Sequence, residues 1–87
     1  MSEDRAIQFP CRFPIKVMGK ESSGLKDIAV ALVGEHLANT DDLDIQTRPS
    51  RNGRFVAVTI TVTAESQAQL DAIYRSLTAH EAVLFAL

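Results

Sequence analysis

Cysteine is almost absent from this chain, as are most residue types that mark specialised chemistry. The 87 residues include one cysteine, Cys11, two histidines and no tryptophan. A single thiol cannot form an internal disulfide, and it cannot build a thiolate cluster for zinc or an iron–sulfur centre. Metal carriage through a cysteine pair is excluded for the same reason. We therefore expect no metal and no other cofactor.

Long apolar runs and a strong excess of one charge are missing as well. No apolar run approaches the ~20 residues that a membrane-spanning helix requires. Glu3 and Asp4 stand near the N-terminus with no apolar stretch after them, which does not fit a secretory signal. The formal net charge is only −2, whereas nucleic-acid-binding domains are typically basic. These features predict a cytoplasmic location and favour neither a membrane nor a nucleic acid as the partner.

The clearest pattern in the chain is a two-residue alternation over residues 54–63. Valine and isoleucine alternate there with alanine and threonine, which is typical of a strand with one buried face. Similar alternation predicts strands at residues 11–18 and 43–48, and an apolar run predicts a final strand at residues 82–87. The Asn-Gly pair that ends the loop of residues 49–53 is typical of a hairpin connection.

Two segments show the spacing of amphipathic helices. In the first, apolar residues recur every three or four positions from Leu25 to Leu37. The second begins after Ser66, a suitable N-cap residue, and Gln69 follows in capping-box register. Its apolar stripe runs over residues 70–77.

The elements follow the order strand, helix, strand, strand, helix, strand. Strand–helix–strand crossovers are right-handed, so both helices should lie on one face of a single four-stranded antiparallel sheet. The predicted fold is an α+β, ferredoxin-like βαββαβ sandwich, with the first and third strands at its centre. We assign residues 1–10 to a flexible N-terminal arm and residues 11–87 to one ferredoxin-like domain.

The final strand is apolar on both of its faces. Val83, Phe85 and Leu87 are expected to face the helices, with Leu84 on the opposite side. An uncovered edge strand of this kind promotes association with other chains. We therefore expect a homo-oligomer.

Six residues are candidates for contact with a ligand or a partner. They are Lys16, Met18, Gly19, Arg48, Arg51 and Arg54. The first three lie on or beside the open face of the first strand, where the turn of residues 19–24 leads into a helix. The three arginines bracket the hairpin loop, and a carboxylate or a phosphate is their expected complement.

The sequence does not suggest an enzyme. His36 and His80 fall near helix ends, and no nucleophile or carboxylate is arranged around either of them. Asp41, Asp42 and Asp44 lie in a turn and lack the ligand spacing of a calcium loop. We expect structural or solvated roles for these side chains.

Two alternative functions are compatible with the same fold. Nucleic-acid binding could use the open sheet face and the arginines, but such sheets expose stacking aromatics on their central strands, and here only Phe55 is available. An acylphosphatase-like enzyme would need an arginine-bearing anion loop after the first strand. That connection holds Lys20 and Glu21 instead.

Several short segments carry a family resemblance. They are Phe9-Pro10, Phe13-Pro14, Lys16-Val17-Met18-Gly19, Pro49-Ser50 with Gly53, Val58-Thr59-Ile60-Thr61 and Ile73-Tyr74. Together they resemble the bacterial YbeD-like family, small cytoplasmic proteins assigned to a domain of unknown function. The resemblance implies a fold similar to the ACT regulatory domains, which bind amino acids at domain interfaces of metabolic enzymes. It also implies a link to lipoate metabolism, because family members are often encoded near lipoate-attachment genes.

The residues and the resemblance favour the same kind of protein. We expect a small non-catalytic regulatory or interaction module. Its partner would be a small metabolite, a metabolic enzyme or a second copy of the chain.

Overall fold

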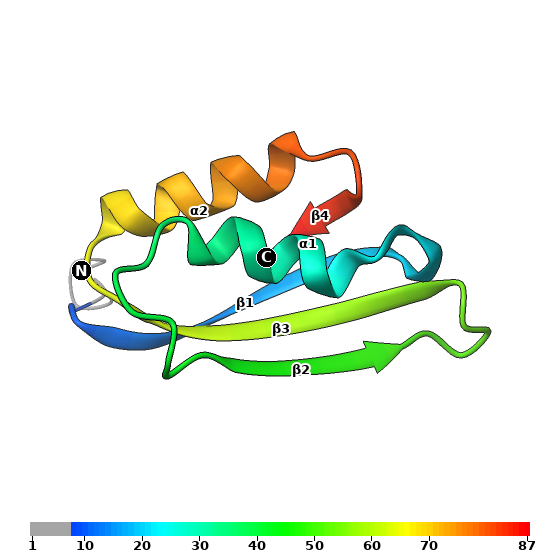
Figure 1. The fold of residues 1–87 in the computed structure, drawn as a ribbon, viewed down its shortest axis with the longest axis horizontal. Coiled ribbons are helices and arrows are strands. Elements are labelled where there is room, and N and C mark those ends of the chain that lie inside the picture. Colours follow the sequence, from blue (N-terminus) through cyan, green and yellow to red (C-terminus); the bar gives the residue numbers. More distant parts are fainter. Residues whose placement is uncertain (1–7) are drawn as a thin grey trace, which may run out of the picture.

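Two helices lie across one face of a four-stranded antiparallel sheet in the computed structural model, which describes residues 8–87 (Figure 1). The strands are β1 (Cys11–Lys20), β2 (Asp44–Pro49), β3 (Phe55–Ala64) and β4 (Val83–Ala86). The two helices are α1 (Leu25–Gly34) and α2 (Gln67–Ala79), and a short 3₁₀ turn, η2 (Glu21–Ser23), precedes α1. The strand order is β2-β3-β1-β4. This confirms the predicted ferredoxin-like α+β sandwich, with the first and third strands at its centre.

Most of the predicted arm, residues 1–7, lies outside the described residues. Phe9, which belongs to the same predicted arm, is half-buried and packs against the core.

The two central strands pair over their full length. Their register runs from Cys11 opposite Ala64 to Lys20 opposite Phe55. Along β3, buried residues alternate strictly with half-exposed ones, as the sequence predicts. The buried set faces the helices, and Phe55, Ala57 and the three threonines of β3 form the open face.

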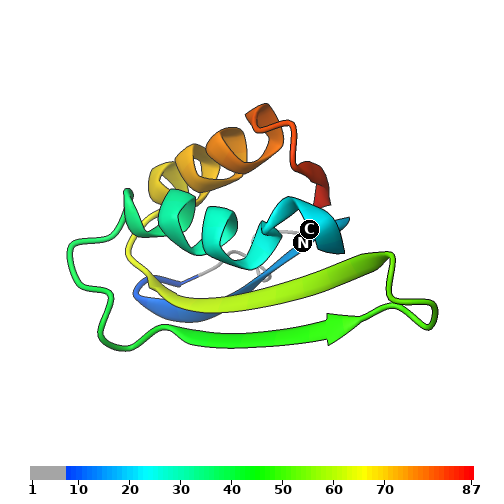
Figure 2. The same ribbon diagram turned by 45° about the vertical axis from the view of Figure 1, so that its right-hand side comes forward.

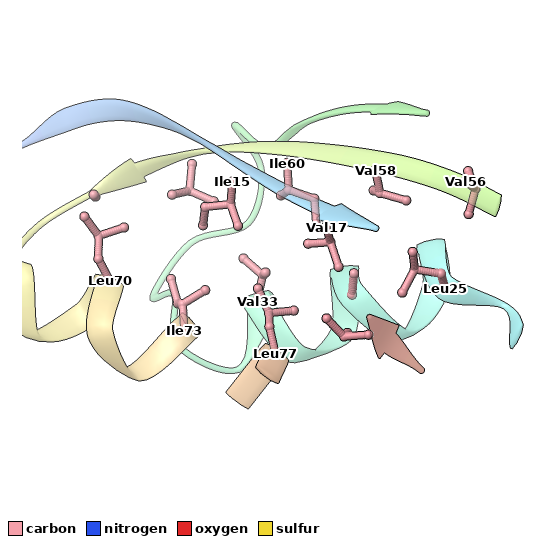
Figure 3. Packing of buried hydrophobic residues seen from close by; sticks show 14 residues of the cluster. Ile15, Val17, Leu25, Val33, Val56, Val58, Ile60, Leu70, Ile73 and Leu77 are labelled. Atoms are coloured by element: carbon pink, nitrogen blue, oxygen red, sulfur yellow. The ribbon is translucent and has the colours of Figure 1, made fainter. Parts of the chain in front are cut away.

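The core lies between this sheet face and the two helices (Figure 3). Leu70, Ile73 and Leu77 of α2 point toward the sheet, and Leu25 and Val33 do so from α1. Burying a side chain of this size contributes about 1.5–3 kcal/mol. Since all five are at most 2% exposed, the apolar stripes that the sequence shows account for the placement of both helices.

The ends of the helices follow their local chemistry. Ser66 caps α2, where its Oγ accepts a hydrogen bond of 3.0 Å from the Gln69 N–H. The Gln69 side chain accepts in turn from the Glu65 N–H at 2.7 Å, one residue before the cap. α1 ends at Gly34, earlier than the apolar spacing to Leu37 suggests, because the chain tightens there. The N–H groups at positions 36 and 37 bond three residues back rather than four.

β1 is longer than predicted by two residues. Gly19 and Lys20, which the sequence assigns to a turn, pair with Val56 and Phe55 of β3. The turn proper begins at Glu21, and Gly24 completes it with a φ of 73° that favours glycine.

The predicted facing of the final strand, residues 82–87, is wrong for two of its three residues, Phe85 and Leu87. Val83 is buried opposite Gly19, but Phe85 pairs with Met18 on the open face of the sheet. One step along β1, from Met18 to Gly19, corresponds to two steps along β4, which is a β-bulge. The extra residue reverses the alternation, so Phe85 is 49% exposed and Leu87 is 69% exposed.

Candidate functional site

The face of the sheet turned away from α1 and α2 carries two adjacent cross-strand rows of side chains. From β1 through β3 to β2, the rows are Lys16–Thr59–Gln46 and Met18–Ala57–Arg48. Neither α1 nor α2 lies over this face (Figures 1 and 2). The strand pairing thus brings Lys16 and Met18 beside residues of β3 that are 43 and 39 positions further along the chain.

These two rows form an open hollow of about 550 Å³. Its lining consists of Lys16, Met18, Gln46, Thr47, Arg48, Ala57 and Thr59. The small side chain of Ala57 stands between the longer Met18 and Arg48, which explains the depression at this point. The volume falls within the range of ~300–1,000 Å³ that is typical of small-ligand sites. Three of the six candidate residues, Lys16, Met18 and Arg48, therefore line one hollow.

The hollow is electropositive. Lys16 and Arg48 line it, and no carboxylate does so among the described residues. Farther along β1, Arg12 is engaged elsewhere, since its Nη1 lies 3.6 Å from Asp42 Oδ2 and 3.1 Å from Thr63 Oγ1. The chain as a whole is slightly acidic, so the positive charge at the hollow is a local property.

Gly19 does not line the hollow; it is buried in the same alternation as Ile15 and Val17 and has a packing role. A Cβ at this position would collide with the Ala82 carbonyl oxygen, and it would lie 3.0 Å from Cδ2 of Leu25. Glycine is required here because the start of β4 crosses β1 closely.

The arginines at the hairpin tip, Arg51 and Arg54, do not line the hollow that Arg48 lines. Arg54 lines a second hollow of about 490 Å³, where the hairpin meets the turn that follows β1. The two segments are joined by a 2.8 Å hydrogen bond from the Glu21 N–H to the Arg54 carbonyl. Glu21 and Lys20 also line this hollow, so its charges are mixed. Arg51 is exposed in the loop and lines neither hollow.

An apolar patch on β4 and the residue after it borders the first hollow. The predicted facing, which turns Phe85 and Leu87 toward the helices, does not anticipate it. Leu84, Phe85 and Leu87 are 52%, 49% and 69% exposed. Phe85 lies directly opposite Met18, so the patch continues the Met18 row to the edge of the sheet. The bulge that exposes Phe85 cannot be recognised from the sequence. In a run where every residue is apolar, reversing the alternation leaves the pattern unchanged.

The histidines take part in hydrogen bonds within the fold. His36 Nε2 lies 2.7 Å from Ser76 Oγ, which joins the end of α1 to α2. His80 Nδ1 accepts a hydrogen bond of 3.0 Å from the Ala82 N–H in the turn before β4. Within residues 8–87, no three histidine, cysteine or acidic side chains gather in a way that could hold a metal ion.

No helix within residues 8–87 has the length and apolar character needed to cross a membrane.

Fold and site together define a small ferredoxin-like domain with an open, electropositive sheet face. Residues 4–87 match the family model described as "Protein of unknown function (DUF493)". The chain belongs to this family, which confirms the resemblance seen in the sequence.

Relatives in other bacteria span the same length. The UPF0250 protein NE1487 of Nitrosomonas europaea is 38% identical over 87 residues, covering 100% of both chains. A UPF0250 protein of Chromobacterium violaceum is 42% identical over 89 residues, again covering 100% of both. The solution structure of protein HP0495 from H. pylori is similar in fold, with a TM-score of 0.74 at 15% identity, and the match covers 100% of this chain and 93% of that one.

Proposed function

We propose that this protein is a non-catalytic interaction module that associates with a second copy of itself through β4. The observation that carries the proposal is the apolar edge formed by Leu84, Phe85 and Leu87. Each of these side chains is about half exposed or more. Large apolar side chains gathered on a sheet edge are typical of surfaces that bind another chain.

The backbone of β4 supports the same proposal. Lys16 and Leu87 exchange two hydrogen bonds, of 3.0 and 2.7 Å, and are thus a hydrogen-bonded pair. In an antiparallel ladder the next pair, Val17 and Ala86, turns its N–H and C=O groups away from each other. Ala86 therefore directs its polar backbone groups to the outside of the sheet, where another strand can bond them.

A second copy fits this edge better than an unrelated strand for a reason of symmetry. Antiparallel pairing of two identical strands about a two-fold axis is self-complementary. β4 contains no charged residue, so two copies would not repel each other across the axis. The result would be one continuous sheet shared by two domains, with both open faces on the same side.

Sedimentation velocity over a range of concentrations tests this proposal. We expect the wild-type protein to dimerise, and Phe85→Lys and Leu84→Lys to weaken the dimer at least about tenfold because each introduces charge at the apolar edge. Gln46→Lys is the matched control, since it places the same charge at an exposed position on the opposite edge strand. Circular dichroism verifies that each variant is folded. A wild-type monomer at every concentration, or variants that dimerise as the wild type does, would contradict the proposal.

The regulatory role, the cytoplasmic location and the link to lipoate metabolism stay predictions. The relatives' names state no activity. An interaction module of this kind would carry out regulation by binding rather than by chemistry.

A further inference from the structure

We infer that the hollow on the open sheet face binds a small organic anion, which has a carboxylate or phosphate head, an apolar body and no ammonium group. This goes beyond the proposed self-association. It concerns the hollow rather than the outer edge of β4, and it holds or fails whether the chain is a monomer or a dimer.

The head group is defined by the donors around the hollow. Lys16 lies on β1 and Arg48 lies on β2, the two strands that flank β3. Their registers differ by two residues, since Lys16 is opposite Thr59 and Arg48 is opposite Ala57. Strand spacings of ~4.8 Å across and ~3.4 Å along the chain place their Cα atoms ~12 Å apart. Their long side chains can therefore approach one anionic group from opposite sides. Thr59, between them on β3, adds a hydroxyl donor at the floor.

The absence of acidic side chains in the lining distinguishes an anion from a zwitterion. The ammonium group of a free amino acid would find no carboxylate among the described lining residues. Asp44 is the acidic residue nearest in register, and it stands in the next row, opposite Thr61. Asp42 already accepts a 2.8 Å hydrogen bond from Thr63 Oγ1 and lies near Arg12. A free amino acid, the ligand that the likeness to ACT domains would suggest, thus fits this hollow poorly.

The apolar body is defined by the second row. Met18 and Ala57 line the hollow, and Phe85 extends the same row beyond Met18. A ligand whose head lies between Lys16 and Arg48 would place its remaining atoms over this apolar row. Burial there adds affinity and favours an organic anion over an inorganic one.

The charge distribution outside the site supports the same assignment. Each helix carries one basic and one acidic residue, namely Lys26 with Asp27 in α1 and Asp71 with Arg75 in α2. The cations of the helix layer are thus each balanced within their own helix. The cations of the hollow, Lys16 and Arg48, have no acidic residue in the lining to balance them. The open face would therefore attract anions.

Amide chemical-shift titration by NMR with 3-phenylpropionate, phenyl phosphate and phenylalanine tests the inference. The first and last probes share the same body and carboxylate, and differ in the ammonium group. We expect saturable shifts at Lys16, Ala57 and Thr59 with either anion, with dissociation constants on the order of millimolar for ligands this small. Phenylalanine should bind at least about tenfold more weakly.

Two double variants complete the experiment. Lys16→Gln with Arg48→Gln should weaken binding of both anions at least about tenfold. Lys26→Gln with Arg75→Gln removes two cations from the helix layer and should leave binding unchanged. Repeating the titration in Leu84→Lys separates ligand binding from self-association, since that variant changes the dimer edge but not the lining.

Three outcomes would overturn the inference. They are the absence of saturable shifts, equal binding of phenylalanine, and equal losses in the two double variants. A single-stranded RNA of ten nucleotides serves as a fourth ligand in the titration, beside the three small probes. If the RNA shifts the same amides with a steep salt dependence while neither anion does, the open face binds nucleic acid and the assigned ligand class is wrong.

Discussion

The two edges of the sheet are built in opposite ways. β2 exposes Asp44 and Arg48 and ends in Pro49. β4 has four residues, Val-Leu-Phe-Ala, without a charge or a proline. Charged side chains and proline are the usual means by which proteins keep an edge strand from pairing with another chain. One edge is therefore protected by its own residues, whereas the other depends on its shortness or on a partner.

The edges also differ in what holds them. β4 packs against α2 as well as β1, and the close crossing at Gly19 fixes its start. β2 lies mainly against β3, and the β2–β3 hairpin extends beyond the helices (Figure 2). The unprotected edge is thus the one tied to the helix layer, which would keep the shape of β4 fixed in the proposed dimer.

The largest expected effect comes from Gly19→Ala, which should displace β4 from β1. The added methyl group would collide with the Ala82 carbonyl oxygen. Overpacking against backbone costs about 1–3 kcal/mol, and we expect a value near the upper end because a carbonyl group cannot rotate away as a side chain can. Urea unfolding measures the loss of stability, and hydrogen exchange shows whether it is concentrated at β4.

Gly34→Ala is the matched control for this substitution. A Cβ at Gly34 would meet only Cγ2 of Thr40, at 3.7 Å, which is ordinary van der Waals contact. Since alanine is the better helix former by about 1 kcal/mol, this variant should be as stable as the wild type or more so. Equal stability of the two alanine variants would contradict the role of Gly19 at the β4 edge.

The second prediction concerns the β2 edge, from which the two protecting charges are removed. Replacing Asp44 and Arg48 together by valine leaves the net charge unchanged and makes the β2 edge apolar. We expect association to strengthen about tenfold and to continue beyond the dimer, because both edges could then pair. Light scattering at increasing concentration measures the effect.

The control for this variant replaces Asp71 and Arg75 of α2 by valine. It removes the same pair of charges from an exposed surface that has no strand edge. If both double variants associate equally, then apolar surface in general, rather than an exposed ladder, causes the effect.

The fold could be predicted from the sequence because its strongest signals are periodic. The alternation in β3 and the apolar stripes of the helices dictate which faces are buried, and the handedness of crossovers then leaves one strand order. The facing of Phe85 could not be predicted, because a bulge in an all-apolar run changes the alternation without changing the composition.

The candidate site was predictable only in part, for a geometric reason. The sequence points to Lys16, Met18 and Arg48 separately, through the open face of one strand and the flank of a hairpin. Their convergence depends on register, which places Ala57 between Met18 and Arg48. Gln46 and Thr59 complete the lining, and nothing in their local sequence distinguishes them from other solvated strand residues.

The smallest expected effect concerns Tyr74 on α2, the helix that contacts β4. Burial raises the pKa of the Tyr74 hydroxyl above its ordinary value of 10.0, because tyrosinate would lose hydration there. The folded state thus holds this proton more tightly than the unfolded chain does. The corresponding stability is fully present below pH 10 and is lost as the pH rises through the folded-state pKa. As the pH rises above 10, the Tyr74→Phe variant should therefore lose less stability than the wild type.

Tyr74 is the only tyrosine and the chain has no tryptophan, so ultraviolet absorbance of tyrosinate follows this one group. In Gly19→Ala, we expect the raised pKa to persist, because Tyr74 packs against the core cluster itself and displacement of β4 would leave that packing in place. A fall of the pKa to 10 in that variant would show that β4 is part of the core's support. The main difference between the two edges would then be that β4 supports the folded core and β2 does not, rather than that β4 is open to a partner.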